Sequence, residues 1–218
     1  RVKGFMDDFP ESPLALQAHW ELANYHYKRK NFSRASEEFM GIRIRDLAKP
    51  KRDELRFKLG HCLFEREKFE KARVYLYDVL DVEGEFQAPA QYYFSHIAYL
   101  NGQPQVALDG FERIADHPAF AELVPLYIAQ LLHATGQFDR LKEYAPPLLD
   151  ESSGLDEKSV AEVAHLLGDA WYRDGAFDTA SPYLELAWEG TDGPGRNPEF
   201  AYQMGYTRYR LGEWRGAL

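Results

Sequence analysis

His165 and Asp169 are four residues apart, and this spacing is the one that most resembles a catalytic pair in the sequence. Side chains at positions i and i+4 of a helix share a face, so the two groups could exchange a proton as an acid and a base. No nucleophile motif accompanies them, and a hydrogen bond along the helix explains the same spacing. We therefore expect no catalytic residues and no enzymatic activity.

Metal and phosphate chemistry find little support in the sequence. The seven histidines are scattered, and the single cysteine, Cys62, directly follows His61, so these two side chains point to different faces of a helix. Structural zinc needs several convergent ligands. The segment TDGPGRN at residues 191–197 lacks the lysine and the preceding strand of a phosphate-binding loop. We expect no metal and no other cofactor, and we expect Cys62 to be a buried thiol.

Aromatic residues are abundant, at 15% of the chain, and they suggest binding. Many recur with polar residues at steps of four and three, which keeps each trio on one helical face. Large flat side chains with a polar end anchor protein interfaces. With Leu126 at the one remaining position, we expect a peptide-binding or protein-binding groove lined by Trp20, Asn24, Tyr27, Phe57, His61, Phe64, Tyr92, His96, Tyr99, Gln130, His133, His165, Asp169, Tyr172, Tyr202, Tyr206 and Tyr209. The alternative is that these rings pack between adjacent helices and complete the core.

Charge is unevenly distributed along the chain. Residues 27–73 hold 15 Lys or Arg against 8 Asp or Glu, whereas the remainder holds 11 against 27. A basic cluster is expected at a helix C-terminus and its loop, where cations interact favourably with the helix dipole; it comprises Arg43, Arg45, Lys49, Lys51 and Arg52. The alternative is a salt-sensitive docking patch for an acidic partner. Nucleic-acid binding is disfavoured because the acidic remainder would repel phosphate.

The elements that position these residues recur six times. A small residue marks the start of each second helix, at intervals of 34–39 residues, in the series Ala35, Ala72, Ala107, Leu141, Ala180 and Ala217. An aromatic residue lies three positions earlier in five of the six copies. Five positions earlier is a turn, where glycine favours the left-handed conformation that ends a helix; its copies are Lys30, Glu67, Gly102, Gly136, Gly175 and Gly212.

The periodic residues predict antiparallel helix pairs along the whole chain. First helices are expected at residues 13–29, 53–66, 88–100, 121–134, 157–173 and 198–211, with Ser12, Asp156 and Asn197 as N-caps. Second helices are expected at 32–47, 69–82, 105–116, 139–149 and 178–188. The pair Pro146–Pro147 should shorten or kink the fourth of these.

These residues resemble the tetratricopeptide repeat, a helix–turn–helix unit of 34 residues. The resemblance implies an all-α, right-handed superhelical solenoid that forms a single domain over residues 1–218, with about five complete repeats and partial repeats at both ends. The repeats would span residues 12–49, 53–85, 88–118, 121–153, 156–192 and, in part, 197–218. It further implies that the first helices line a concave wall, and that the chain is a scaffold for a protein or peptide partner.

Two segments narrow the resemblance. Residues 9–39 are similar to bacterial periplasmic members, namely outer-membrane assembly lipoproteins and Tol–Pal-associated coordinators of division, and residues 92–111 resemble long repeat proteins of the Bacteroidetes type. These similarities imply a periplasmic or outer-membrane-associated role in the cell envelope. The family's clamp for chaperone tails is not expected, because only Asn24 fits it and Trp20 occupies the lysine position.

The sequence has no initiator Met, no signal-peptide pattern and no apolar run of the roughly 18 residues that would suggest a membrane span. Because the pattern starts and stops inside a repeat, we expect a piece of a longer protein. The alternative to a binding groove is self-association through the incomplete end repeats, which would expose Val2, Phe5 and Trp214.

Overall fold

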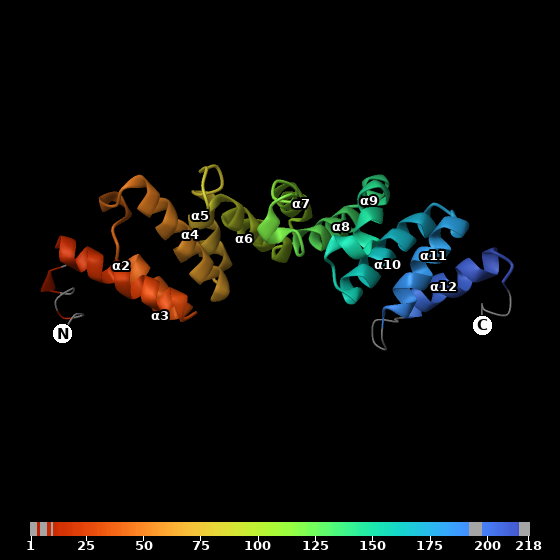
Figure 1. Cartoon of the computed structure of the whole chain (residues 1–218), viewed down its shortest axis with the longest axis horizontal. Coiled ribbons are helices and arrows are strands. Elements are labelled where there is room, and N and C mark those ends of the chain that lie inside the picture. Colours follow the sequence, from red (N-terminus) through yellow and green to blue (C-terminus); the bar gives the residue numbers. More distant parts are fainter. Residues whose placement is uncertain (1–3, 5–7, 10, 192–197, 214–218) are drawn as a thin grey trace. The chain divides into compact units, whose positions relative to one another are not determined.

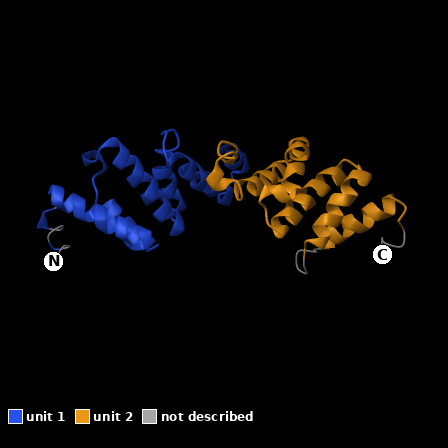
Figure 2. Ribbon diagram, viewed as in Figure 1, with its two compact units in different colours: residues 1–110 blue, residues 111–218 orange. Residues whose placement is uncertain are grey.

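The computed structural model describes residues 4, 8, 9, 11–191 and 198–213. Over these residues the chain consists of helices, turns and loops without a strand (Figure 1), which confirms the predicted all-α class. The chain divides into two compact units, residues 1–110 and 111–218 (Figure 2). The assignment of residues 1–218 to one solenoid domain stays a prediction.

Unit 1 is built from antiparallel helix pairs. Its first pair begins where Ser12 caps the helix, since the Ser12 hydroxyl accepts a hydrogen bond from the Leu14 amide at 3.3 Å and Pro13 is the first helical residue. The helices are α2 (Pro13–Lys28), α3 (Phe32–Met40), α4 (Lys49–Glu65), α5 (Phe69–Tyr77), α6 (Gln87–Leu100) and α7 (Pro104–Glu112), the last of which ends just inside unit 2.

Unit 2 repeats the same pattern. Asp156 caps its longest helix, because its carboxylate accepts a hydrogen bond from the Ser159 amide at 2.8 Å. The helices are α8 (Val124–Ala134), α9 (Phe138–Tyr144), α10 (Glu157–Arg173), α11 (Phe177–Glu189) and α12 (Pro198–Arg210). The predicted cap at Asn197 lies outside the described residues.

The small positions allow the two helices of a pair to approach closely. Ala35, Ala72, Ala107, Leu141 and Ala180 are fully buried, and Ala217 lies outside the described residues. A Cβ atom added at Gly60 would lie 2.8 Å from Leu76 Cγ, and one added at Gly168 would lie 2.7 Å from Leu184 Cδ2. The same contact therefore recurs in both units, at positions that are equivalent in the repeat.

The six predicted turn positions all have a left-handed backbone. The φ angles are +55° at Lys30, +56° at Glu67, +66° at Gly102, +70° at Gly136, +74° at Gly175 and +78° at Gly212. The turn prediction is therefore confirmed, including the two copies that carry a side chain where glycine would be favoured.

Helix boundaries differ from the prediction mainly at the C-terminal ends of the second helices. Most second helices stop early, α3 at Met40 rather than at residue 47 and α9 at Tyr144 rather than at 149. Short 3₁₀ turns follow several of them, and the one at Pro146–Leu149 confirms that the proline pair ends the α-helix. Conversely, α4 begins at Lys49, four residues before the predicted start, because Pro50 is tolerated in a first turn.

The described parts of the chain ends are short. Gly4 and Asp8 are helical. Val2, Phe5 and Trp214, on which the idea of self-association through incomplete repeats depends, lie outside the described residues. Within the described ranges, no helix has both the length and the apolar character required to cross a lipid bilayer.

Candidate functional site

The predicted wall of unit 1 is formed by α2, α4 and α6, and its inner part is closed by contacts between rings. The Tyr27 hydroxyl lies 2.6 Å from His61 Nδ1, and the His61 ring stacks on Tyr93 with 4.5 Å between centroids. Phe64 lies 4.9 Å from the same tyrosine ring, and Phe57 is 8% exposed. Burial lowers the pKa of His61 and raises that of Tyr27. These rings therefore contribute to packing between the first helices.

A polar strip continues this wall across α2 and α4. Lys58 Nζ donates to Asn24 Oδ1 at 2.6 Å and to Glu54 Oε1 at 2.5 Å. The Asn24 amide in turn donates to the Trp20 carbonyl at 2.9 Å, and Lys51 Nζ lies 5.2 Å from the centroid of the Trp20 ring. Asn24, the residue that fits the chaperone-tail clamp, is thus engaged within the wall.

The α6 trio contains the one exposed residue among the predicted groove residues of unit 1. Tyr92, His96 and Tyr99 follow one another along α6 in edge-to-face contact, with centroid distances of 5.8 Å and 6.3 Å. Tyr99 is 37% exposed, and burial lowers the pKa of His96. Of the predicted unit 1 residues, Tyr99 offers the most accessible ring.

In unit 2 a buried carboxylate links three first helices. Asp169 on α10 is 4% exposed, and it accepts hydrogen bonds from His133 Nε2 at 2.7 Å, Arg173 Nε at 2.5 Å and Gln203 Nε2 at 2.5 Å. Burial by itself would raise the pKa of Asp169, but the bonds from His133 and Arg173 outweigh it and lower the pKa to about 2. Asp169 therefore positions α8, α10 and α12, and it offers little surface to a partner.

His165 and Asp169, the candidate acid–base pair, are not hydrogen-bonded to each other; both contact Gln203 instead. His165 Nε2 lies 3.4 Å from Gln203 Oε1, and the same glutamine donates to Asp169. Gln130 Nε2 donates to Glu162 Oε1 at 2.6 Å, and Leu126 is half-buried. These predicted residues contribute a network across the first helices.

What we call the tyrosine surface consists of the exposed residues Tyr202 and Tyr209 and the half-buried residues Tyr172 and Tyr206, all joined by ring contacts. Tyr202 and Tyr206 stack at 5.8 Å, Tyr206 and Tyr209 at 6.2 Å, and Tyr172 meets Tyr206 edge to face at 6.0 Å. Tyr202 is 65% exposed and Tyr209 is 50% exposed. Arg210 lies beside them: its Nη1 donates to the Tyr206 hydroxyl at 3.2 Å, and its Cζ is 4.4 Å from the centroid of Phe177.

Several residues of these surfaces were not predicted. Lys58, Tyr93 and Gln203 each lie two residues before the small residue in the middle of their first helix, which is Gly60, Ser95 or Gly205. Arg173 and Arg210 each lie five residues after the equivalent residue, Gly168 or Gly205. The structure brings them onto the same walls as the predicted trios. Comparing all positions of the first helix across the copies, rather than three of them, would have found them.

The prediction for the basic cluster was partly wrong. Arg43 and Arg45 do follow the C-terminus of α3, but Lys49, Lys51 and Arg52 lie in the first turn of α4. The N-terminal end of a helix dipole disfavours cations. The error has the same origin as the boundary error, because α4 was expected to begin only at Asp53.

Among the described residues, no group of three or more His, Cys, Asp or Glu side chains is arranged to hold a metal ion. Cys62 is fully buried, and burial raises the pKa of its thiol to about 12. A thiol with that pKa stays protonated at neutral pH and is a poor nucleophile.

Comparison with known proteins identifies the fold. No protein-family model matches the chain. No curated protein matches it either. Solved structures do: YrrB, described as a TPR protein with an unusual peptide-binding site, has a TM-score of 0.66 at 14% identity over 88% of this chain and 94% of its own.

Two further structures support the same conclusion. MamA has a TM-score of 0.59 at 17% identity, with 93% of this chain and 97% of MamA covered. A tetratricopeptide repeat protein from Parabacteroides merdae has a TM-score of 0.53 at 15% identity over 99% of this chain and 80% of its own. At these identities the likeness establishes the fold, which is that of tetratricopeptide repeat proteins.

Proposed function

We propose that this chain is a non-enzymatic scaffold whose first-helix surfaces bind a peptide or helix of a partner protein. The observation that carries the proposal is the exposure of the tyrosine surface, where Tyr202 and Tyr209 keep 65% and 50% of their area accessible. Tyrosine and arginine dominate the energetics of protein interfaces, and both are concentrated here. The peptide-binding site named for YrrB agrees with such a role.

The tyrosine surface is also held in place before any partner arrives. Tyr206 is fixed by ring contacts with Tyr172 and Tyr202 and by the hydrogen bond from Arg210. A side chain that is already ordered loses little conformational entropy on binding, so more of its contact energy appears as affinity. Tyr99 on α6 is a second, smaller candidate contact in unit 1.

The test is capture of peptides from a displayed random library by the immobilised wild-type chain, followed by titration of an enriched peptide. Replacing Tyr202→Ala together with Tyr209→Ala should weaken binding at least about tenfold, since each ring of an interface centre contributes roughly 1 kcal/mol or more. Tyr99→Ala, in a separate variant, reports whether unit 1 takes part.

The matched control is Tyr77→Ala, which removes a tyrosine that is also 65% exposed but lies on the second helix α5. It should leave affinity unchanged. Circular dichroism melts of every variant should stay close to wild type, because the substituted rings are exposed. The proposal is wrong if the library yields no enriched peptide, or if the double variant binds an enriched peptide as tightly as the Tyr77 variant does.

We further propose that this recognition serves an assembly of the bacterial cell envelope. The support is the similarity of residues 9–39 to periplasmic members of the repeat family. Fractionation of cells that express the complete gene tests this proposal. Recovery in the periplasmic or outer-membrane fraction is expected, and recovery only with cytosolic marker proteins would contradict it.

A further inference from the structure

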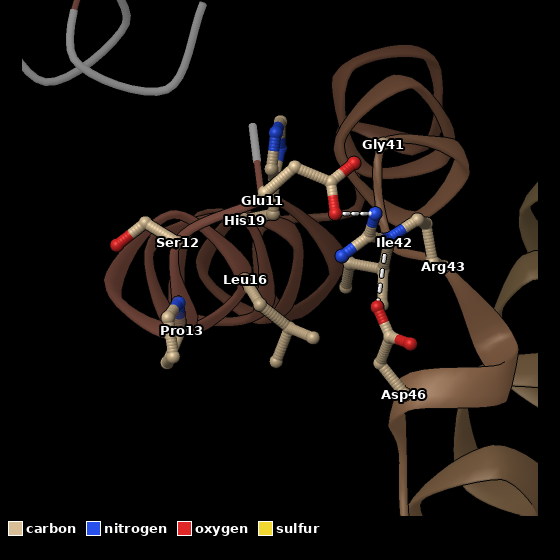
Figure 3. Close-up of a pocket in the computed structure, with 9 residues that line it drawn as sticks. All are labelled: Glu11, Ser12, Pro13, Leu16, His19, Gly41, Ile42, Arg43 and Asp46. Atoms are coloured by element: carbon tan, nitrogen blue, oxygen red, sulfur yellow. Dashed lines mark hydrogen bonds and ion pairs between the residues drawn. The ribbon is translucent and has the colours of Figure 1, made fainter. Parts of the chain in front are cut away.

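A pocket of about 320 Å³ opens in unit 1 between the start of α2 and the segment that follows α3 (Figure 3). It shares no residue with the predicted groove. Pro13, Leu16 and Ile42 supply an apolar side, and Ile42 is 5% exposed. The polar lining residues are Glu11, Ser12, His19, Arg43 and Asp46. This pocket therefore has one apolar side and a polar side, and small-ligand sites likewise combine apolar lining with placed polar groups.

Arg43 is the central polar group of this pocket. Its Nη1 pairs with the Glu11 carboxylate, and its Nε donates to Asp46 Oδ2 at 2.6 Å. The remaining nitrogen, Nη2, has no ion-pair or hydrogen-bond partner among the residues that the structure describes, and in Figure 3 it points toward Leu16. The guanidinium fork is therefore only partly used by the chain itself.

Glu11 is loosely held although it pairs with Arg43. Its side chain is 77% exposed, and the hydrogen bond from Arg43 lowers its pKa, with smaller contributions from the charges of Arg43 and Arg45. Exposed ion pairs contribute little net free energy, so a competing carboxylate can replace Glu11 at small cost. Arg45, 80% exposed, adds positive charge beside the pocket.

The opposite side of the pocket is fixed by His19. Its Nδ1 lies 2.8 Å from Oε2 of Glu38, a carboxylate that is 6% exposed. The ring rests against the backbone at Gly41, where an added Cβ would lie 2.6 Å from His19 Cε1. A buried acid on one side and a glycine on the other thus hold the imidazole at the pocket's edge.

We propose that this pocket binds a carboxylate that carries a branched apolar group, and that Glu11 occupies the carboxylate position when the ligand is absent. The ligand's carboxylate would pair with the fork of Arg43, and its apolar group would cover Leu16 and Ile42. The volume suits a group of amino-acid size. The same chemistry is offered by a free N-blocked amino acid and by the C-terminal residue of a protein.

The probes are N-acetyl-leucine, the peptide acetyl-Gly-Gly-Ser-Leu with a free C-terminus, and the amide of each, titrated into the isotope-labelled whole chain by NMR. We expect saturable shifts of pocket residues with the acids and none with the amides. Glu11→Gln should tighten binding several-fold by removing the competitor, and Arg43→Gln should weaken it at least about tenfold by removing a charge-assisted fork.

Two further variants keep the test decisive. Arg45→Gln removes a neighbouring charge that does not line the pocket, and it should change affinity far less than Arg43→Gln does. If Arg43→Gln reduces helicity, Arg43→Lys keeps the charge without the planar fork and should still weaken binding.

Tighter binding of the peptide than of N-acetyl-leucine supports the proposal and assigns a protein C-terminus as the ligand, whereas equal binding supports it and assigns the free acid. The proposal is overturned if the acids shift no pocket resonance of either the wild-type chain or the Glu11→Gln variant. It is also overturned if the amides bind as tightly as the acids, or if the Arg43→Lys variant binds the acids as tightly as wild type does.

Discussion

Single residues in the turns show where the sequence departs from what backbone geometry favours. Four of the six left-handed turns carry glycine. The turns of the first two helix pairs, both in unit 1, carry Lys30 and Glu67 instead. A side chain in this conformation brings Cβ close to the following carbonyl oxygen and costs about 1–2 kcal/mol. Unit 1 should therefore gain stability from glycine at these positions.

We predict that Glu67→Gly raises the free energy of unfolding by about 0.5–1 kcal/mol, because relief of strain exceeds the added freedom of the unfolded chain. Urea denaturation measures the change. Gly102→Ala is the reverse control: its φ is +66° and an added Cβ would meet no atom within 4 Å, so the loss it causes comes from backbone strain alone. A Glu67 variant less stable than wild type would contradict the argument.

Asp169 leads to a prediction about how the stability of the folded chain depends on pH. Its pKa in the folded chain is about 2, below the ordinary 3.8, so its stabilising contribution is complete above pH of about 4 and is lost as pH falls toward 2. Asp169→Asn should cost roughly 2 kcal/mol at neutral pH through weaker bonds to His133 and Arg173. Melting curves between neutral and acidic pH should then show a smaller acid loss in the variant, and equal losses in both proteins would refute this role.

At the scale of helices, the close contact within each pair depends on glycine at two equivalent places. Gly60→Ala would push Cβ against Leu76, and Gly168→Ala would push it against Leu184. Both leucines are fully buried and cannot move aside easily. We predict a loss of about 1–3 kcal/mol for either substitution, as for other overpacked cores. Thermal or urea unfolding should give similar values for the two, and an effect confined to one would show that the contacts are not equivalent.

Helix identity was predictable because buried small residues and turn residues recur at fixed offsets. Ends of second helices were not, because apolar residues such as Ile42 and Leu47 continue the pattern beyond α3 while being buried from a loop instead. Periodicity reports which side chains are buried and does not report whether the backbone between them is still helical. Proline was the exception, since Pro146 marked the end of α9 correctly.

The positions of the candidate surface residues on the helices were predictable, but their exposure to solvent was less so. The trios lie on the first helices, yet Phe57 is buried against Phe86 and Tyr93 of the next pair, whereas Tyr202, in the same register, is 65% exposed. Tyr202 lies on α12, the last helix that the structure describes, so no described first helix follows to cover it. The pocket around Arg43 was missed because Glu11 precedes the cap of α2 and His19 lies on α2, while Arg43 and Asp46 follow α3.

At the scale of the whole molecule, net charge differs between the two units. Residues 1–110 hold 17 Lys or Arg and 17 Asp or Glu, whereas residues 111–218 hold 9 and 18. Each helix pair buries its apolar face against its neighbours, so stability in such stacks is a sum of local terms. A destabilising substitution in unit 2 should therefore lower the local stability of unit 2 more than that of unit 1.

We predict that Asp169→Asn speeds amide hydrogen exchange in α8, α10 and α12 while α2 to α5 exchange at wild-type rates, because the lost hydrogen bonds belong to unit 2. Mass spectrometry of peptic fragments resolves the two groups of helices. The matching variant Gly60→Ala should give the opposite pattern. Equal acceleration throughout the chain in both variants would mean that the two units unfold as one.

The burial of Cys62 makes the chain a convenient host for spectroscopic labels. With its single native thiol enclosed and its pKa raised to about 12, maleimide reagents at neutral pH should ignore it. A cysteine introduced at an exposed site would then be the sole point of attachment, without prior removal of the natural one. Fluorophores or spin probes placed in this way beside either proposed site would report ligand occupancy directly in solution.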